Sequence, residues 1–157
     1  MKQWIDKQIH AKYTPYVLAF LIPFLVMAAV CAGHGIYPFG ENSFLHIDMY
    51  HQYAPFFMEF QRKLKAHESL MFSWNLGLGS DFVATFAYYL ASPVNWLVVF
   101  CSKQHLIEFM TVLVLLKIAC SGLFFAIYLG RHFKDNSYLV TLVSMFYALS
   151  AYISAYS

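Results

Sequence analysis

The chain has little charge: only 11% of its 157 residues are Asp, Glu, Lys or Arg, whereas 61% are hydrophobic. A soluble domain of this length needs a far more charged surface to stay dispersed, so this scarcity excludes an ordinary soluble fold. The formal net charge is +2, and Lys and Arg do not gather into a basic patch, so nucleic acid is not an expected partner. The low charge predicts a membrane protein.

Standard catalytic and metal-binding signatures are also missing. The sequence has no Ser-His-Asp pattern and no zinc signature. Cys31, Cys101 and Cys120 lie in or beside apolar runs without metal-ligand spacing, and we interpret them as small hydrophobic residues. Gly77 and Gly79 lack the strand–helix context of a phosphate-binding loop, and a plain turn accounts for them. Standard motifs therefore do not identify a function.

The sequence is instead rich in long apolar segments. Residues 16–36 form an uncharged run that is long enough to cross about 30 Å of hydrocarbon at about 1.5 Å per residue. Residues 105–130 and 137–157 predict two further spanning helices. A cleaved signal peptide is the alternative for the first run, although the later segments keep the chain in the membrane in either case. These segments predict an all-α, polytopic transmembrane helical bundle.

Residues 82–101 are apolar, but Ser92, Pro93 and Asn95 interrupt their middle. This pattern predicts a bent helix that is partly embedded in the membrane, with a short spanning helix as the alternative. The last segment stays apolar and aromatic to residue 157, without a flanking charge. We therefore expect the chain to be the N-terminal part of a larger membrane protein.

The polar region 37–81 is too long for a tight turn, and it predicts a long first loop. Within it, Pro55 can open a helix at its first position. One face of this helix would carry Phe56, Phe57, Phe60 and Leu64, with the polar residues turned away from it, namely Glu59, Arg62, Lys63 and Lys65. The pattern predicts an amphipathic helix over Pro55–His67 that lies along the membrane surface. The alternative is a helix packed on a soluble domain outside this sequence.

Positive charges favour one orientation of the chain. If residues 82–101 do not cross the membrane, one side carries Lys2, Lys7, Lys12, Arg131 and Lys134, and the other carries Arg62, Lys63, Lys65 and Lys103. Cytoplasmic loops are enriched in Lys and Arg, so the larger set predicts a cytoplasmic N-terminus and an extracytoplasmic first loop. If residues 82–101 do cross, the bias reverses.

The most suggestive polar stretch is His46-Ile47-Asp48-Met49-Tyr50-His51-Gln52-Tyr53 in the first loop. A carboxylate near a membrane surface can act as a general base toward a hydroxyl group or can help to bind a divalent metal. His46, Asp48 and His51 can in principle converge on one ion, although their spacing is irregular. The alternative for Asp48 is a helix cap or a solvated acid.

Lys117 lies near the middle of the predicted helix 105–130, too far from either end to reach the interface easily. A charge at this depth usually faces the bundle interior, where it is paired or lines a polar cavity. Lys117 is therefore a candidate for binding an anionic group such as a lipid phosphate. The alternative is a structural ion pair with a helix outside this sequence.

The order of these pieces resembles the start of the YfhO family of bacterial membrane proteins. The resemblance covers Tyr16 to Ser157, and it rests on Asp48…Gln52-Tyr53…Pro55-Phe56, Trp74…Gly77-Leu78-Gly79, Tyr88-Tyr89-Leu90…Ser92-Pro93 and Leu116-Lys117. That family is similar to the GT-C superfamily of integral membrane glycosyltransferases. The resemblance therefore implies a multi-pass protein of the bacterial cell membrane whose first extracytoplasmic loop carries a functional acid.

By resemblance, the donor would be a sugar on a polyprenyl phosphate, and the acceptor a cell-envelope glycopolymer or lipid such as lipoteichoic acid. Asp48 takes the place of the catalytic loop acid. It stands as a single Asp beside Met49, not as an Asp-x-Asp pair, so a divalent metal is possible but not implied. The substrate-binding candidates are Lys117, Arg62, Lys63, His51 and Gln52.

Two other classes of function fit the sequence. In a transporter or flippase for a lipid-linked envelope precursor, Lys117 would belong to a polar path across the bilayer, and Asp48 would be incidental. In a membrane assembly protein, the chain would contact membrane lipids and partner proteins without any chemistry of its own.

Overall fold

The computed structural model of the chain describes residues 2–134 and 136–150, with side chains from residue 13 onward. The chain divides into two compact units, which we call the helical unit (Met1–His34 with Val114–Ser157) and the loop unit (Gly35–Leu113). Helices make up nearly all of the regular structure in both units, which confirms the predicted all-α fold.

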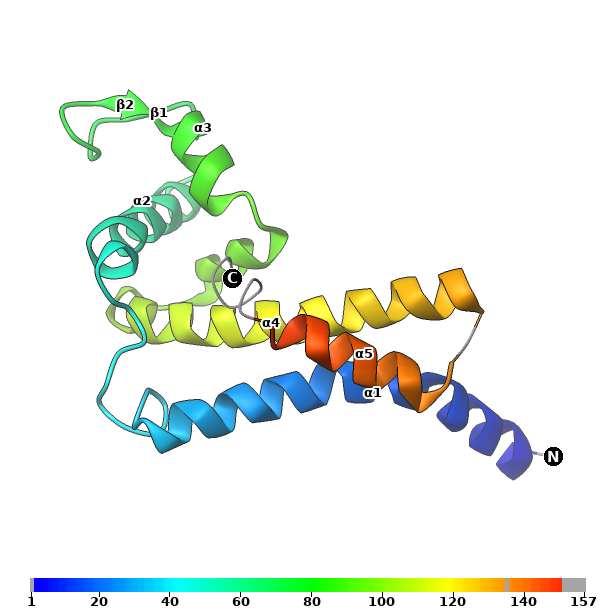
Figure 1. The fold of residues 1–157 in the computed structure, drawn as a ribbon. Coiled ribbons are helices and arrows are strands. Elements are labelled where there is room, and N and C mark those ends of the chain that lie inside the picture. Colours follow the sequence, from blue (N-terminus) through cyan, green and yellow to red (C-terminus); the bar gives the residue numbers. More distant parts are fainter. Residues whose placement is uncertain (1, 135, 151–157) are drawn as a thin grey trace. The chain divides into compact units, whose positions relative to one another are not determined.

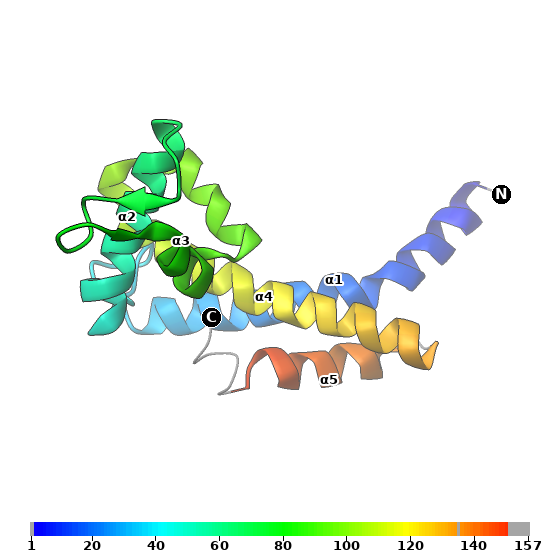
Figure 2. The ribbon, with the colours of Figure 1, turned by 90° about the horizontal axis from the view of Figure 1, so that it is seen from above.

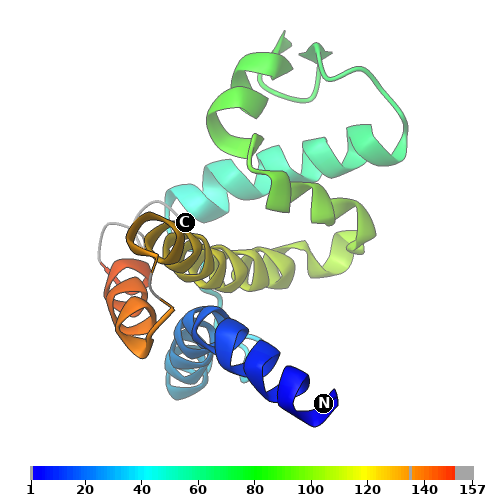
Figure 3. The same ribbon diagram turned by 90° about the vertical axis from the view of Figure 1, so that its right-hand side faces the viewer.

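The helical unit consists of α1 (Lys2–Gly33), the larger part of α4 (Leu106–Phe133) and α5 (Tyr138–Ala148). These helices run side by side, as Figures 1 and 2 show, and Figure 3 views them nearly end-on. Two segments are long and apolar enough to span a membrane, Tyr13–Gly33 and Lys103–Phe133. In the predicted third span, 137–157, α5 is shorter, and residues 151–157 lie outside the described part of the chain.

Small residues bring α1 and α4 into backbone contact. Pro23 has no N–H group, so the carbonyl of Ala19 lacks its usual partner within α1. Gly122 of α4 lies against this carbonyl so closely that a Cβ atom at position 122 would collide with the oxygen. On α5, the Thr141 hydroxyl donates a hydrogen bond to the Pro15 carbonyl oxygen at 3.0 Å. Close approach at small residues is the usual way in which membrane helices pack.

The loop unit is built from short and partly irregular elements. Two of them, η1 (Met49–Tyr53) and η2 (Phe86–Leu90), are single π-helical turns that continue directly into or out of α-helices. The other elements are α2 (Ala54–Lys65), β1 (Phe72–Ser73), β2 (Ser80–Asp81), α3 (Phe82–Thr85), the 3₁₀ helices η3 (Pro93–Phe100) and η4 (Lys103–His105), and the first residues of α4.

The glycine-punctuated segment after α2 forms the tip of a hairpin. Strands β1 and β2 pair in antiparallel fashion, with Phe72 opposite Asp81 and Ser73 opposite Ser80. Gly77 and Gly79 have φ angles of 60° and 105°, a region that other residues rarely adopt. The expected turn at these glycines is therefore present, but it connects two strands that the sequence did not predict.

The apolar segment 82–101 contains a sharp bend. Helices Phe82–Leu90 and Pro93–Phe100 meet at 106°, an arrangement typical of a broken span or a re-entrant loop. The break falls at the Ser92-Pro93 pair that the sequence singled out, because proline disfavours helical geometry in the residue before it. The buried core of the loop unit includes residues from both arms of the bend and from neighbouring helices, namely Phe60, Phe82, Leu90, Val98 and Leu106.

One prediction about α2 is wrong. The pattern placed Glu59 and Lys63 away from the packed face, but these side chains are only 5% and 3% exposed. The apolar residues Phe57 and Phe60 are buried as expected. The hairpin that follows α2 contacts its polar face as well, so α2 is covered on two sides. Helical periodicity indicates which residues share a face, but not how many faces are covered.

Candidate functional site

A network of polar side chains attaches the hairpin to α2. The Glu59 carboxylate accepts hydrogen bonds from Arg62 Nε at 2.8 Å and Nη2 at 2.9 Å, from Ser73 Oγ at 2.6 Å and from Asn75 Nδ2 at 2.9 Å. The Arg62 hydrogen bond is the largest cause that holds the pKa of Glu59 at about 2, below its usual 4.5. A buried carboxylate with this many donors is stable in its charged form.

The two neighbouring cations complete this network, which we call the Glu59 brace (Glu59, Arg62, Lys63, Glu68, Ser73 and Asn75). Arg62 also donates to both oxygens of Glu68, at 2.6 and 2.7 Å. Lys63 Nζ donates to the carbonyl oxygens of Ser69 at 2.9 Å and Phe72 at 2.7 Å. Arg62 and Lys63 were candidates for substrate binding, but their donor groups are directed at protein partners that hold the hairpin in place.

The two π-helical turns of the loop unit pack against each other through polar and aromatic side chains. Gln52 Nε2 of η1 donates a hydrogen bond to the Tyr89 hydroxyl of η2 at 2.9 Å. The Tyr53 ring meets the Tyr89 ring edge to face, with 5.0 Å between centroids, and the Phe56 ring also lies 5.0 Å from Tyr89. Tyr88 packs on Tyr89 at 4.6 Å. Single π-helical turns inside helices occur frequently at functional sites.

Asp48 lies at the start of this arrangement, immediately before η1. Its side chain is exposed, and it makes no capping hydrogen bond, although the residue occupies the N-cap position. Burial is the largest cause that raises the pKa of Tyr53. Charge repulsion from Tyr89, Tyr88 and Asp48 raises this pKa further. The Tyr53 hydroxyl is therefore close enough to these three groups for their charges to act on it. We call Asp48, Gln52, Tyr53, Tyr88 and Tyr89 the Asp48 site.

The backbone beside Asp48 is strained. Ile47 has a φ angle of 46°, and its side chain is 78% exposed. A β-branched residue rarely adopts this left-handed conformation, because its branched Cβ crowds the backbone. Strained positions of this kind cluster at functional sites, where the surrounding structure maintains them. The strained residue therefore lies immediately before the exposed Asp48 carboxylate.

Comparison with known proteins identifies the family to which the chain belongs. The family model described as bacterial membrane protein YfhO matches residues 19–157. The chain belongs to the YfhO family. No curated protein and no solved structure matches it. As a YfhO-family chain with two helices long enough to span, it is a membrane protein, as the sequence predicted.

The histidines near Asp48 do not join it in a metal centre. Within residues 13–134 and 136–150 of this YfhO-family chain, His, Cys, Asp and Glu side chains form no group of three that could hold a metal ion. His46 and His51 are both exposed, and the His51 ring stacks edge-on against Tyr50 at 5.3 Å. His51 therefore remains an accessible candidate for substrate contact beside Asp48, without a metal.

Lys117 belongs to the helical unit of the YfhO-family chain. It lies within the spanning segment Lys103–Phe133, and its side chain is half-buried. Its neighbours Ile118 and Ala119 are fully buried. A partly buried cation in a spanning helix remains a candidate for binding an anionic group.

The tyrosines of the Asp48 site were not among the residues selected from the sequence. Tyr88 and Tyr89 stood only in the motif that carried the family resemblance, and Tyr53 stood beside Gln52. The available signal was their co-occurrence in those motifs. The contact between Gln52 and Tyr89, which are 37 residues apart, depends on the bend that follows η2 and on the packing of η2 on α2.

Proposed function

We propose that this chain is the donor-binding and catalytic part of a membrane glycosyltransferase. The enzyme transfers a sugar from a polyprenyl phosphate to an extracytoplasmic glycopolymer or lipid of the cell envelope, with the N-terminus in the cytoplasm. Membership of the YfhO family supports a membrane protein of this general type. The observation that carries the proposal is the exposed Asp48 carboxylate, which the fold does not use for capping.

Asp48 acts as the general base in this reaction. A hydroxyl oxygen of the acceptor attacks the anomeric carbon of the donor sugar, and its proton passes to the Asp48 carboxylate. The bond between the anomeric carbon and the lipid phosphate oxygen breaks, and polyprenyl phosphate leaves. General-base catalysis typically contributes about 10²–10⁴-fold to a rate.

The surrounding residues of the Asp48 site orient the substrates. The Tyr53 hydroxyl is protonated at neutral pH, as in any tyrosine, and burial raises its pKa further, so it can donate a hydrogen bond to a sugar or phosphate oxygen. Gln52 is positioned by Tyr89 and retains its amide oxygen as an acceptor. The exposed rings of Tyr50 and Tyr88 provide flat apolar surfaces of the kind on which a sugar or an isoprenoid can pack.

A cation is needed to stabilise the charge that develops on the leaving phosphate. Lys117, Arg62 and Lys63 are the candidates for this role. Arg62 makes paired hydrogen bonds to two carboxylates, and Lys63 is almost fully buried on two carbonyl groups. A divalent metal is not part of the proposal.

The test compares Asp48→Asn with Glu41→Gln in the full-length protein. Both changes remove one exposed acid from the same loop, but Glu41 lies outside the Asp48 site. Transfer is measured as incorporation of labelled sugar into the envelope fraction of cells that lack the native copy. We expect Asp48→Asn to lower transfer by about 10²-fold or more, and Glu41→Gln to leave it unchanged.

Normal decoration by Asp48→Asn would remove Asp48 from the mechanism and overturn the proposal. A transporter or flippase would give a different pattern, in which Lys117→Met abolishes delivery of the lipid-linked precursor while Asp48→Asn has no effect. Asp48→Asn therefore distinguishes the two functions, because it lowers activity only if the chain is a transferase.

A further inference from the structure

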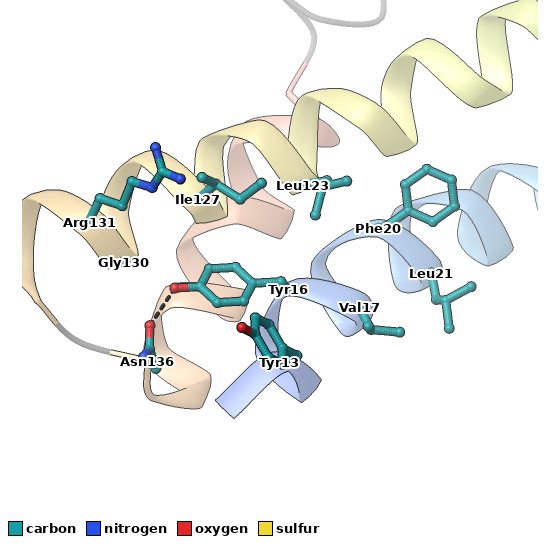
Figure 4. Close-up of a pocket in the computed structure, with 10 residues that line it drawn as sticks. All are labelled: Tyr13, Tyr16, Val17, Phe20, Leu21, Leu123, Ile127, Gly130, Arg131 and Asn136. Carbon is teal, nitrogen blue, oxygen red and sulfur yellow. Dashed lines mark hydrogen bonds between the residues drawn. The ribbon is translucent and has the colours of Figure 1, made fainter. Parts of the chain in front are cut away.

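The helical unit contains a cavity that the proposed transfer reaction does not use. It has a volume of about 850 Å³, within the range of roughly 300–1,000 Å³ that is typical of small-molecule sites. Figure 4 shows the residues that line it: Tyr13, Tyr16, Val17, Phe20 and Leu21 from α1, Leu123, Ile127, Gly130 and Arg131 from α4, and Asn136 before α5. On each of the two helices, the lining residues recur every three or four positions and so share one face.

Two glycines of α4 explain the shape of this cavity. At Gly122, α4 lies directly against the Ala19 carbonyl, and the lining begins with the next residues, Phe20 and Leu123. At Gly130, the absent side chain leaves room for the Tyr16 phenol, which a Cβ atom would strike. The Tyr16 hydroxyl then donates a hydrogen bond to Asn136 Oδ1. The cavity therefore lies between these two close contacts, from the Gly122 contact to Gly130.

The two ends of the cavity differ in chemistry. Its walls near the Gly122 contact are apolar, whereas the Gly130 end carries the hydroxyls of Tyr13 and Tyr16, the amide of Asn136 and the guanidinium of Arg131. Arg131 is exposed and makes no ion pair or hydrogen bond within the part of the chain that the structure describes. A ligand that fits both ends has an apolar chain and an anionic headgroup.

The position of the cavity along the helices indicates the same class of ligand. Tyr13 is the first residue of one spanning segment, and Arg131 lies in the last turn of α4. The polar end therefore lies at a membrane edge, while the apolar walls lie within the hydrocarbon layer. Basic pockets between transmembrane helices on one side of the membrane are known to bind anionic lipid headgroups.

We propose that this cavity binds one anionic glycerophospholipid, with its phosphate at Arg131 and one acyl chain between α1 and α4. The Tyr16 and Asn136 side chains line the same end of the cavity. This site is separate from the Asp48 site and does not depend on the proposed transfer reaction. Its occupant is a resident membrane lipid rather than the polyprenyl-phosphate donor.

The test counts lipids that remain bound to the purified full-length protein in native mass spectrometry. The probes are dioleoylphosphatidylglycerol and dioleoylphosphatidylcholine, which differ in headgroup charge but not in acyl chains. Arg131→Gln removes the lining charge, and Lys134→Gln is the matched control, because Lys134 is exposed nearby but does not line the cavity. Ile127→Trp and Val17→Phe fill the apolar walls from α4 and α1, respectively.

We expect the unmodified protein to retain dioleoylphosphatidylglycerol about tenfold more strongly than dioleoylphosphatidylcholine. This ratio corresponds to one charge-assisted contact. Arg131→Gln should reduce this preference to near unity, and Lys134→Gln should leave it intact. At least one wall variant that remains folded should retain less of both lipids. Equal losses in Arg131→Gln and Lys134→Gln would show diffuse attraction instead of a site and would overturn the proposal. Unchanged retention in both wall variants would also overturn it, because the cavity would then be filled by protein.

Discussion

Different interactions stabilise the inside of the helical unit and the inside of the loop unit. In the helical unit, small residues such as Gly122, Ala19 and Ala126 bring helix backbones together. In the loop unit, the short helices are tied by charged and amide side chains around an aromatic core. Apolar side chains gain little by leaving a lipid environment, so close packing has to hold spanning helices together. Residues in contact with water have the hydrophobic effect and ion pairs available as well.

The irregular helices of the loop unit show why these ties are needed. At the end of the 3₁₀ helix η3, the Cys101 N–H donates to the Val98 carbonyl oxygen at 3.1 Å, and side chains of α2 bond the same end of the helix. Gln61 Nε2 donates to the carbonyl oxygens of Val98 at 2.9 Å and Cys101 at 3.0 Å, and Lys65 Nζ donates to Cys101 O at 2.5 Å. The polar residues of α2 therefore have two roles. Glu59 and its neighbours form the Glu59 brace, and Gln61 and Lys65 cap η3. The loop unit should depend on these polar residues far more than the helical unit does.

The largest expected effect follows from removing the centre of the brace. Glu59→Ala leaves Lys63 without the buried one of the two carboxylates within 4 Å, and it removes the acceptor of Ser73 and Asn75. Breaking a buried ion pair costs about 3–5 kcal/mol, so the hairpin should detach from α2. Limited proteolysis of the full-length protein should show new cleavage between residues 66 and 81. Glu68→Ala, which removes an exposed partner of Arg62, should have a much smaller effect, and equal cleavage in both variants would contradict the role of Glu59.

Acid should weaken the same unit selectively. The pKa of Glu59 is about 2 in the folded chain and returns to its usual 4.5 on unfolding, so its contribution is complete above about pH 4.5 and decreases as the pH falls toward 2. At about pH 3 the loss amounts to about 2 kcal/mol. Cleavage of the hairpin should therefore increase between about pH 4.5 and 2 but not between about pH 5 and 8. Glu59→Gln should make this profile flatter, and an unchanged profile in that variant would assign the acid sensitivity to other groups.

An effect of similar size to the acid effect is expected in the helical unit. Gly122→Ala places a methyl group against the Ala19 carbonyl and should destabilise the contact between α1 and α4 by about 1–3 kcal/mol. Gly33→Ala is the control, because a Cβ atom there meets nothing within 4 Å. Thermal unfolding in detergent should show a lower midpoint for Gly122→Ala only. Equal midpoints would mean that the glycine contact does not hold the helices together.

The sequence was most informative where one physical effect dominates. Hydrophobicity and length indicated the spanning segments, and the Ser92-Pro93 pair coincides with the bend, because proline acts locally. The burial of Glu59 and Lys63 was missed, because it depends on a hairpin that returns to α2 from elsewhere in the chain. The π-helical form of η1 and η2 was also missed, since the same residues suit an ordinary α-helix.

The candidate site was predictable only where its residues lie close together in the sequence. Asp48, Gln52 and His51 lie in one short stretch, so the sequence could group them as candidates. Tyr89 joins the Asp48 site only through tertiary packing, and the partners of Arg62 and Lys63 are likewise set by the fold. In the structure the donor groups of these two cations contact the hairpin, and their role in substrate binding stays a prediction. The chemical role of Asp48 itself stays a proposal.

The orientation of the first loop is the claim on which the proposed chemistry depends most directly. It is measured by labelling intact cells with a membrane-impermeant maleimide, using full-length protein in which all native cysteines have been replaced. Single cysteines are introduced as Glu41→Cys in the loop unit and Lys134→Cys after α4, both at exposed positions. We predict labelling of the Glu41→Cys protein in intact cells, and of the Lys134→Cys protein only after the membrane is permeabilised. The reverse pattern would place Asp48 in the cytoplasm and contradict transfer to an extracytoplasmic acceptor.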